Sequence, residues 1–404
     1  MGETAVNETS QQMAYKAVPE PVVSEPVVSE PVVSKPMAPE PVVSELVTSS
    51  TARKKLLIAA SGTGGHLFPA IATAQQLVDY DIEWLGVPDR LETQLVPDLY
   101  PLHTVRMGGA QGGFGLGSAK LFAKFVRSTQ QVRRLLKRGN FAGVFTTGGY
   151  ISAPAILAAR SLGLPALMHE SNALPGKVTR FLSPYCTKVA LGFAETAARL
   201  PKADTVVVGT PVRSQFLELT QSSPTDLDIP DDVPLIVVVG GSQGAVAVNQ
   251  MVRAAAPAWL NAGIWIVHIT GTNDTESKTF AHPHYIQRDF YNNMAALFSR
   301  ANLVISRAGA GTLIELAITA SPSILIPYPF AAEDHQTYNA TAFADAGAAQ
   351  IYQQRDLDAA KLQTLGLALI TNPEQLAAMS SSAAQLSTLD SASKMAALID
   401  NCLR

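Results

Sequence analysis

A histidine lies at the end of a glycine-rich turn near the beginning of the chain. Residues 61–70 read SGTGGHLFPA and join the apolar run KKLLIAA to the alanine-rich segment AIATAQQLVD. We expect this turn to connect a strand to a helix, where unpaired N–H groups and glycines allow a phosphate to approach. His66 is a candidate general base, because histidine titrates near neutral pH. Its alternative role is to orient the loop or to bind phosphate.

Three further glycine-rich turns follow the same pattern. They read TTGGYISAP (146–154), VGGSQGA (239–245) and SRAGAGTLIE (306–315), and each follows an apolar run and precedes a helical pattern. One such turn is common, but two in each half of the chain indicate two phosphate-bearing ligands. The first turn is not the dinucleotide fingerprint G-x-G-x-x-G, because Leu67 occupies the third glycine position. A dehydrogenase is therefore disfavoured.

The elements that must position these turns alternate regularly between strand and helix. Apolar, β-branched runs occur at 54–60, 81–87, 142–148, 165–170, 188–193 and 205–211, and again at 234–241, 265–271, 302–309, 323–329 and 348–353. Nearly continuous apolar strands separated by helices predict parallel sheets that are covered on both faces. We therefore expect an α/β fold with two Rossmann-like domains facing across a cleft. Ligands should bind at the C-terminal ends of the strands.

The expected organisation has four parts. Residues 1–52 contain the proline repeat EPVVSEPVVSEPVVSKPMAPEPVVSEL, which excludes helix and central strand and predicts a disordered, extended tail. A partner-binding role for this tail stays open. The first domain should cover 53–208 and the second 209–386, with a hinge near GTPVR (209–213). Residues 387–404 should form a helix that packs back on the first domain.

Composition favours a reduced cytoplasmic protein. The chain has 404 residues, of which 47% are hydrophobic, and this exceeds one ordinary core. Its apolar runs are shorter than the roughly 18 residues that span a bilayer, and no signal-peptide pattern is present. Cys186 and Cys402 show no metal or redox spacing. Paired acidic residues occur only away from the glycine turns, so we predict no metal site.

Seven motifs in order identify a family. They are GTGGHLFPA, GGYISAP, HESNALPGK, GTPVR, GGSQGA, SRAGAGTLIE and HQTYNA. Over roughly residues 53–404 the chain resembles the MurG family of bacterial glycosyltransferases, in glycosyltransferase family 28. The resemblance implies the GT-B fold and inverting, metal-independent transfer of N-acetylglucosamine. The donor would be UDP-GlcNAc, and the acceptor the 4-hydroxyl of N-acetylmuramoyl-pentapeptide on undecaprenyl diphosphate (lipid I to lipid II) in peptidoglycan synthesis. No cofactor is expected.

The resemblance assigns UDP-GlcNAc mainly to the second domain. Glu315 would accept the ribose hydroxyls, Gln336 would contact the sugar, and Phe290 and Tyr291 would lie against the uracil. The full set of expected donor contacts is Thr63, Gly64, Gly65, Asn172, Arg213, Ser242, Phe290, Tyr291, Ala310, Gly311, Thr312, Leu313, Ile314, Glu315 and Gln336.

Each of these donor contacts has an ordinary structural alternative. Glu315 and Arg213 could be surface residues, with Arg213 in a salt bridge, and Arg213 could also bind the acceptor. Ser242 could be a plain helix cap. One of the two aromatic residues could be part of the core.

The first domain would bind the acceptor diphosphate. Its expected contacts are Gly62, Gly64, Gly65, Gly148, Gly149 and Tyr150. The expected catalytic residues are His66 as base, Glu170 as a rival base, and Asn172, which would orient sugar or acceptor hydroxyls. Ser61 departs from the family pattern, which has glycine there. We expect little effect from this change unless the position requires a positive φ.

A cationic segment is expected to meet the membrane. No Asp or Glu occurs from Leu99 to His169, whereas nine Lys and Arg do. A solvated cationic face is one explanation, and attraction to anionic lipid is the other. Within residues 112–138 the expected membrane contacts are Phe114, Leu116, Lys120, Phe122, Lys124 and Arg127. The protein would then be peripheral on the cytoplasmic face of the plasma membrane.

The expected partners are UDP-GlcNAc, lipid I, anionic lipids and other cell-wall synthesis proteins, with no nucleic acid. Three other functions remain open. A transferase of the same fold could act on diacylglycerol, a UDP-sugar 2-epimerase would consume UDP-GlcNAc without an acceptor, and a non-catalytic sensor would bind UDP without turnover.

Overall fold

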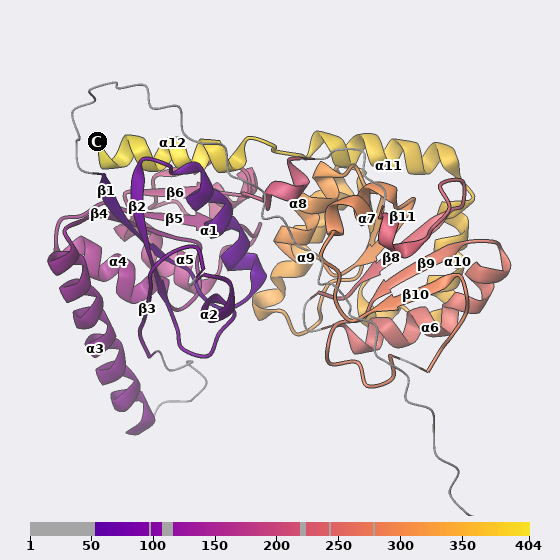
Figure 1. Cartoon of the computed structure of the whole chain (residues 1–404), viewed down its shortest axis with the longest axis horizontal. Coiled ribbons are helices and arrows are strands. Elements are labelled where there is room, and N and C mark those ends of the chain that lie inside the picture. The colour runs from indigo at the N-terminus through magenta and orange to yellow at the C-terminus, as the bar shows by residue number, and fades with distance from the viewer. Residues whose placement is uncertain (1–52, 97, 107–115, 219–223, 242–243, 278) are drawn as a thin grey trace, which may run out of the picture. The chain divides into compact units, whose positions relative to one another are not determined.

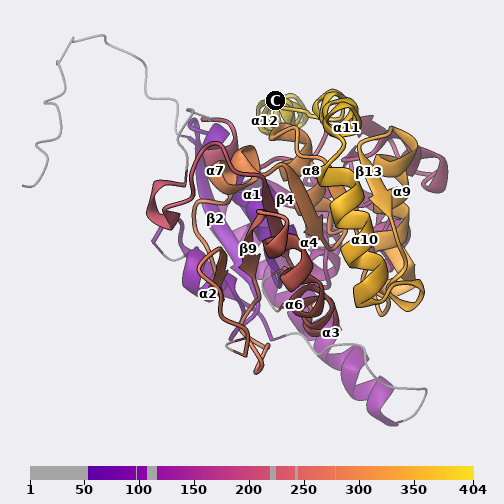
Figure 2. The same cartoon turned by 90° about the vertical axis from the view of Figure 1, so that its right-hand side faces the viewer.

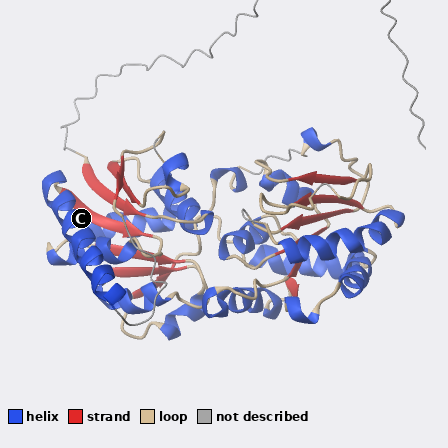
Figure 3. Cartoon of the chain, turned by 90° about the horizontal axis from the view of Figure 1, so that it is seen from below, coloured by secondary structure: helices blue, strands red, loops and turns tan. Residues whose placement is uncertain are grey.

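The computed structural model describes residues 53–96, 98–106, 116–218, 224–241, 244–277 and 279–404, with side chains omitted at 116–121 and 225. The proline-repeat tail lies outside these residues. The residues described form one compact unit. It contains two parallel sheets with helices around them (Figures 1 and 3).

The first sheet has seven parallel strands in the spatial order β3-β2-β1-β4-β5-β6-β7. The strands are β1 (Lys54–Ala59), β2 (Tyr80–Gly86), β3 (Leu102–Thr104), β4 (Phe141–Thr146), β5 (Ala166–Glu170), β6 (Lys188–Leu191) and β7 (Thr205–Val207). The helices within this part of the chain are α1 (Gly64–Gln76), α2 (Glu92–Leu95), α3 (Leu116–Gly139), α4 (Ser152–Ser161) and α5 (Lys177–Leu182). Short 3₁₀ helices follow at η1 (Ser183–Tyr185) and η2 (Ala194–Arg199).

The second sheet has six parallel strands in the order β10-β9-β8-β11-β12-β13. The strands are β8 (Leu235–Val239), β9 (Trp265–Ile269), β10 (Tyr285–Arg288), β11 (Leu303–Ser306), β12 (Ser323–Leu325) and β13 (Ala349–Ile351). The later helices are α6 (Val246–Asn261), α7 (Met294–Arg300), α8 (Ala310–Ile318), α9 (His335–Asp345), α10 (Ala359–Ile370), α11 (Pro373–Gln385) and α12 (Ser391–Leu403). Short 3₁₀ helices are η3 (Ser214–Phe216), η4 (Thr225–Leu227), η5 (Ala332–Asp334) and η6 (Gln354–Asp356).

Both sheets are buried on both faces, as the continuous apolar runs predict. In β1, Leu56 and Ile58 pack with α1 and α12, while Leu57 and Ala59 pack with α3 and α4. In the second sheet, β8 alternates in the same way between the helices α7 to α9 on one face and α6 and α10 on the other. The helices α6 to α10 can be followed in Figure 2. The prediction of two Rossmann-like parallel-sheet domains is therefore confirmed.

The strand orders explain why the glycine turns occur in pairs. In the first sheet β1 and β4 are neighbours whose connections leave in opposite directions, and in the second sheet β8 and β11 have the same relationship. Such a reversal opens a crevice at the C-terminal ends of the two strands. The turns at 61–66 and 147–151 follow β1 and β4, and those that begin at Gly240 and Arg307 follow β8 and β11. Each pair therefore lies at one reversal point.

Helix α12 packs on the first sheet, although it follows the second in sequence (Figure 1). Its residues Met395, Ile399 and Leu403 are buried in the core that contains β1 and α1. The hydroxyl of Tyr80 donates to Asp400, and Lys54 donates to the carbonyl oxygen of Leu403. The last helix therefore ties the two halves of the chain together.

The expected hinge is held by strand β5 and by the last helix. His169 Nε2 lies 2.8 Å from the carbonyl oxygen of Gly209, and Ser391 donates to the carbonyl oxygen of Thr210. Gly209 has a φ of +78°, and a Cβ there would lie 2.7 Å from Thr388. This position therefore requires glycine.

Two edge strands do not appear among the predicted apolar runs. Strands β3 (LHT) and β10 (YIQR) are short and partly polar, so neither has a clear strand pattern. Each lies at the edge of its sheet, where a strand pairs with a single neighbour and polar side chains are tolerated.

Candidate functional site

The first two glycine turns meet at His66. This residue lies in the first turn of α1, and Thr147 Oγ1 donates to its carbonyl oxygen at 2.7 Å. Gly148 and Gly149 have φ values of +97° and +78°. A Cβ on Gly148 would lie 3.4 Å from Nε2 of His66, and one on Gly149 would lie 3.6 Å from Nδ1. The two turns therefore pack around one imidazole ring.

The environment of His66 favours its neutral form. Burial lowers the pKa of the imidazole below its usual value, and the nearby charge of Glu170 and the backbone of Ser61 oppose this shift. A neutral imidazole has a free lone pair, so it can accept a proton from a hydroxyl group. His66 is therefore in the state that a general base requires at neutral pH.

The helix N-termini leave N–H groups for a ligand. The cap residue Thr63 makes no side-chain cap to α1, and in the described ranges the N–H groups of Gly64 and Gly65 have no hydrogen-bond partner. Those of Gly149 and Tyr150, before α4, are also unpaired there, and the Tyr150 side chain is exposed. These positions can receive the oxygens of a phosphate.

Gly62 differs from the other predicted acceptor contacts. Its N–H donates to Oε2 of Glu92 at 3.1 Å, so that group is already paired within the protein. Glu92 was not predicted from the sequence, because it lies outside all seven motifs.

Glu170 is surrounded by hydrogen-bond donors. Its Oε1 accepts from the backbone N–H and the side-chain Nδ2 of Asn172, at 3.0 and 2.9 Å. Its Oε2 accepts from the N–H of Gly176 at 3.1 Å and from the hydroxyl of Thr179 at 2.5 Å. Four donors occupy the lone pairs that a general base would use. This arrangement favours a structural role for Glu170 and leaves His66 as the candidate base.

Asn172 is held at both ends of its amide. Its Nδ2 donates to Glu170, and its Oδ1 accepts from Nδ2 of Asn339 at 3.1 Å. Asn339 is fully buried, accepts from the N–H of Ala173, and donates to the carbonyl oxygen of Ala308. It therefore links the loop after β5 with the loop after β11. The motif HQTYNA contains Asn339 and Gln336, but only Gln336 was predicted to be a contact.

Glu315 and Arg213, both predicted donor contacts, form an ion pair. Arg213 Nη2 lies 2.7 Å from Oε1 of Glu315, and the two side chains are 24% and 13% exposed. Burial raises the pKa of Glu315, and the charge of Arg213 opposes this shift. The surface alternatives do not fit either residue, because both side chains are mostly buried.

The turn before α8 resembles the first one in its free N–H groups. In the part of the chain that the structure describes, the N–H groups of Ala310, Gly311 and Thr312 have no hydrogen-bond partner. Leu313 and Ile314 are buried in the core, so only their backbone could line a ligand site. Gln336 Oε1 accepts from the N–H groups of Ala308 and Tyr328. Its amide nitrogen therefore points away from these two backbone groups.

The two predicted uracil contacts have different environments. Phe290 is 62% exposed, so its ring is available to a ligand. Tyr291 is 7% exposed, packs in the second-domain core, and donates its hydroxyl to Asp226 at 2.6 Å. Tyr291 is therefore the aromatic residue that belongs to the core.

Some predicted contacts cannot be placed. Ser242 and Phe114 lie outside the described residues, and for Leu116 and Lys120 only the helix is described. Phe122 is 69% exposed on α3, and Lys124 and Arg127, two and five residues further along, are also exposed. No described helix is long and apolar enough to cross a membrane.

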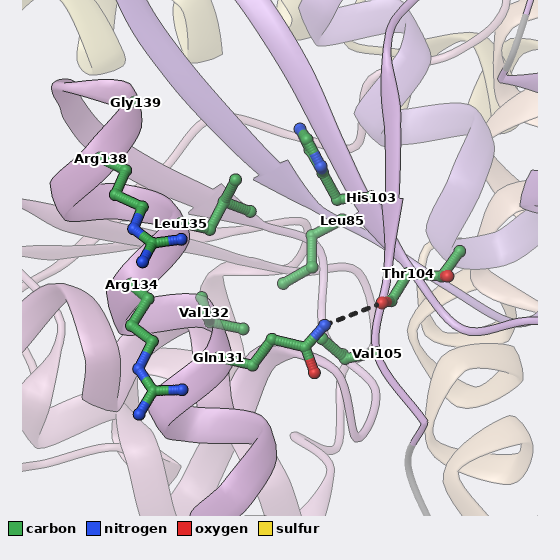
Figure 4. A pocket seen from close by; sticks show the side chains of 10 residues that line it. All are labelled: Leu85, His103, Thr104, Val105, Gln131, Val132, Arg134, Leu135, Arg138 and Gly139. Atoms are coloured by element: carbon green, nitrogen blue, oxygen red, sulfur yellow. Dashed lines mark hydrogen bonds between the residues drawn. The ribbon is translucent and has the colours of Figure 1, made fainter.

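A pocket of about 590 Å³ lies between α3 and β3, away from the predicted site (Figure 4). Arg134 and Arg138 line it from successive turns of α3, and Gln131 donates to the carbonyl oxygen of Thr104 at its edge. None of the predicted ligand contacts lines this pocket. Among the described residues, no group of three or more His, Cys, Asp or Glu is arranged to hold a metal ion.

Comparison with known proteins agrees with the division of the chain into two domains. The family model for the glycosyltransferase family 28 N-terminal domain matches residues 56–191, and the model for the C-terminal domain matches residues 235–396.

Two curated relatives have the same printed name, UDP-N-acetylglucosamine–N-acetylmuramyl-(pentapeptide) pyrophosphoryl-undecaprenol N-acetylglucosamine transferase. The relative from Nostoc sp. is 61% identical over 345 residues, which is 85% of this chain and 97% of the relative. The relative from Rippkaea orientalis is 59% identical, over 86% of this chain and 98% of the relative. The crystal structure of Acinetobacter baumannii MurG superposes with a TM-score of 0.71 at 32% identity, covering 86% of this chain and 99% of that one.

Proposed function

The chain belongs to glycosyltransferase family 28, and we propose that it transfers N-acetylglucosamine from UDP-GlcNAc to lipid I, forming lipid II. The observation that carries the proposal is the meeting of two glycine turns around His66 at the reversal point of the first sheet. The similar pair of turns in the second sheet supports a second diphosphate site. A transferase that joins a nucleotide sugar to a diphospholipid requires both sites.

His66 would act on the acceptor. Its neutral imidazole takes the proton from the 4-hydroxyl of N-acetylmuramic acid while that oxygen attacks C1 of N-acetylglucosamine. The bond between C1 and the β-phosphate oxygen breaks, and UDP leaves with the electron pair. Attack opposite the leaving group inverts the anomeric centre. The free N–H groups of Gly64, Gly65, Gly149 and Tyr150 would hold the acceptor diphosphate.

The second domain would bind the donor. The free N–H groups at the start of α8 and the guanidinium of Arg213 can stabilise the negative charge that develops on UDP. Oε2 of Glu315 would accept from the ribose, and the exposed ring of Phe290 would lie against the uracil. The amide nitrogen of Gln336 would donate to the sugar.

We propose that the reaction needs no metal ion, because the N–H groups and Arg213 can stabilise the leaving diphosphate. Transfer by the purified protein should then be unchanged after treatment with a chelator. Restoration of a lost activity by magnesium alone would contradict this part of the proposal.

Contact with the membrane would come from the N-terminal half of α3. Phe122, Lys124 and Arg127 are all exposed there, and the acceptor is a lipid. Exposed aromatic and cationic side chains on one helix are typical of a segment that meets anionic headgroups. We therefore propose that the protein is peripheral on the cytoplasmic face of the plasma membrane and works with other enzymes of cell-wall synthesis.

Liposome flotation tests the membrane contact. Phe122→Ser should reduce binding to vesicles that contain anionic lipid, whereas Phe181→Ser, a control with a still more exposed ring on α5, should not. Equal binding by the two variants would contradict the contact.

The transfer reaction is tested with a choice of acceptors. Wild-type protein should transfer labelled sugar to a short-chain lipid I analogue and not to diacylglycerol or to a 4-deoxy form of the analogue. Consumption of UDP-GlcNAc without any acceptor would favour the epimerase, and binding of UDP without turnover would favour the sensor.

A further inference from the structure

A carboxylate is buried beneath the first glycine turn. Glu92 begins the short helix α2, and its side chain is 0% exposed. Oε1 accepts from the N–H of Val87 at 2.8 Å, and Oε2 accepts from the N–H of Gly62 at 3.1 Å. One side chain therefore joins the turn after β1 to the loop after β2.

The partners of Glu92 are backbone groups and not cations. In the described ranges it forms no salt bridge with Lys, Arg or His. Burying a carboxylate is unfavourable unless hydrogen bonds replace the lost water. An apolar side chain could fill the same space at a lower desolvation cost. The feature that distinguishes Glu92 is therefore its pair of hydrogen bonds to backbone N–H groups.

The backbone around Glu92 fits this side chain closely. Gly62 has a φ of +112°, which favours glycine, and its N–H donates to the carboxylate. On the other side, a Cβ added to Gly86 would lie 2.7 Å from Cγ of Glu92. Glycine at position 86 therefore leaves the space that the carboxylate needs to reach Gly62.

We propose that Glu92 is a positioning residue that fixes the first glycine turn for the acceptor diphosphate. It holds the N–H of Gly62 away from the ligand, while the N–H groups of Gly64 and Gly65, two and three residues later, stay unpaired. His66 follows directly, so the same hydrogen bond also sets the position of the imidazole. This inference rests on the proposed function, because it assigns the turn to the acceptor.

Kinetics of Glu92→Gln test the proposal. Glutamine has the same shape, but its amide nitrogen cannot accept a hydrogen bond, so one of the two N–H groups loses its partner. We expect kcat/KM for the lipid I analogue to fall about tenfold or more. UDP affinity, measured by calorimetry, should stay within about twofold, because the donor contacts lie elsewhere. Glu83→Gln is the matched control, since Glu83 lies on β2 and pairs with Lys55 and His103.

Amide hydrogen exchange of residues 61–66 gives a readout that does not require activity. In Glu92→Gln this turn should exchange faster than in wild type, while the turn before α8 should be unchanged. If wild-type protein transfers no sugar but the turn still loosens, the proposed function fails and the structural role of Glu92 stands.

Two results would overturn the inference. One is wild-type exchange together with wild-type acceptor kinetics in a folded Glu92→Gln protein. The other is an equal loss of acceptor turnover and UDP affinity, which would mean that Glu92 only stabilises the fold. If Glu92→Gln does not fold, Gly86→Ala tests the inference instead, because the added Cβ displaces the carboxylate of Glu92 without removing it. That variant should show the same selective loss, and normal acceptor kinetics would overturn the inference.

Discussion

Arg213 donates two hydrogen bonds to a single oxygen of Glu315, with Nη2 and Nε at 2.7 and 3.2 Å from Oε1. Among the described residues, Oε2 of Glu315 has no such partner. The guanidinium also lies 4.8 Å from the ring of Phe68, which is on the same helix as His66. Arg213 therefore contacts both Glu315, the proposed ribose contact, and the helix that carries His66, the proposed base.

Glu315→Gln should weaken UDP binding about tenfold or more, because its one amide oxygen cannot accept from both Arg213 and the ribose, and the charge-assisted bond is lost. Calorimetry with UDP measures the change. Glu374→Gln, on the exposed first turn of α11, is the control and should bind UDP like wild type. Unchanged UDP affinity in Glu315→Gln would rule out the ribose contact.

His66→Ala should lower kcat by about 10²- to 10⁴-fold while UDP affinity is retained. The base must be unprotonated to act, and burial lowers the pKa of His66. Wild-type kcat/KM should therefore fall only as the pH drops through a value below the usual histidine pKa of about 6.5. Steady-state rates across a pH series check this. A midpoint above that value, or near-normal turnover by His66→Ala, would exclude His66 as the base.

Glu170→Gln separates positioning from base catalysis. An amide cannot accept from all four donors, so the melting temperature and kcat/KM should both fall. The acidic limb of the pH profile should persist but move to lower pH, because His66 still titrates and loses the nearby charge that raises its pKa. Thr179→Val removes one of the donors and should give a smaller loss of the same kind. If the acidic limb disappears in Glu170→Gln, Glu170 is the base.

Much of the fold could be predicted because the strands are buried on both faces and therefore read as continuous apolar runs. The glycine turns could be placed for the same reason, since each follows such a run. The strands β3 and β10 could not, because edge strands carry polar residues.

The site was harder to predict, because its side chains meet only in three dimensions. The sequence gives no signal that Glu92 reaches Gly62, or that Asn339 reaches Asn172, over separations of 30 and 167 residues. It also could not decide which of Phe290 and Tyr291 is buried. Both are aromatic, and only packing distinguishes them.

Phe290→Ala should affect UDP binding, whereas Tyr291→Phe should affect stability. Loss of the exposed Phe290 ring should weaken UDP binding by about 1–3 kcal/mol, a range typical of a base stacked on an aromatic ring, with little change in melting temperature. Tyr291→Phe removes the hydrogen bond to Asp226 and should lower stability by about 1.5–3 kcal/mol with UDP affinity unchanged. Calorimetry and urea unfolding distinguish the two. Weaker UDP binding in Tyr291→Phe alone would reverse these assignments.

Buried histidines should make the protein acid-sensitive. His268 is fully buried between Tyr285 and Asn249, and burial lowers its pKa to about 3, with the charge of Arg253 acting in the same direction. The unfolded chain binds a proton near pH 6.5, so the free energy of unfolding should fall as pH drops below that value. The limiting slope for this group is about 1.4 kcal/mol per pH unit.

Urea unfolding of wild type and His268→Gln between pH 7.5 and 5 isolates this contribution. The variant should be less stable at pH 7.5 but should lose less stability on acidification. Equal slopes for the two proteins would show that His268 does not titrate differently in the folded state.

The most direct test of the account is transfer of labelled N-acetylglucosamine from UDP-GlcNAc to a short-chain lipid I analogue. Wild type, His66→Ala and Glu315→Gln should be assayed together, with UDP affinity measured on each. We predict that wild type forms the lipid II analogue, that His66→Ala binds UDP normally but transfers at least about a hundredfold more slowly, and that Glu315→Gln binds UDP weakly. A wild-type protein that binds UDP and transfers nothing to this acceptor would contradict the account.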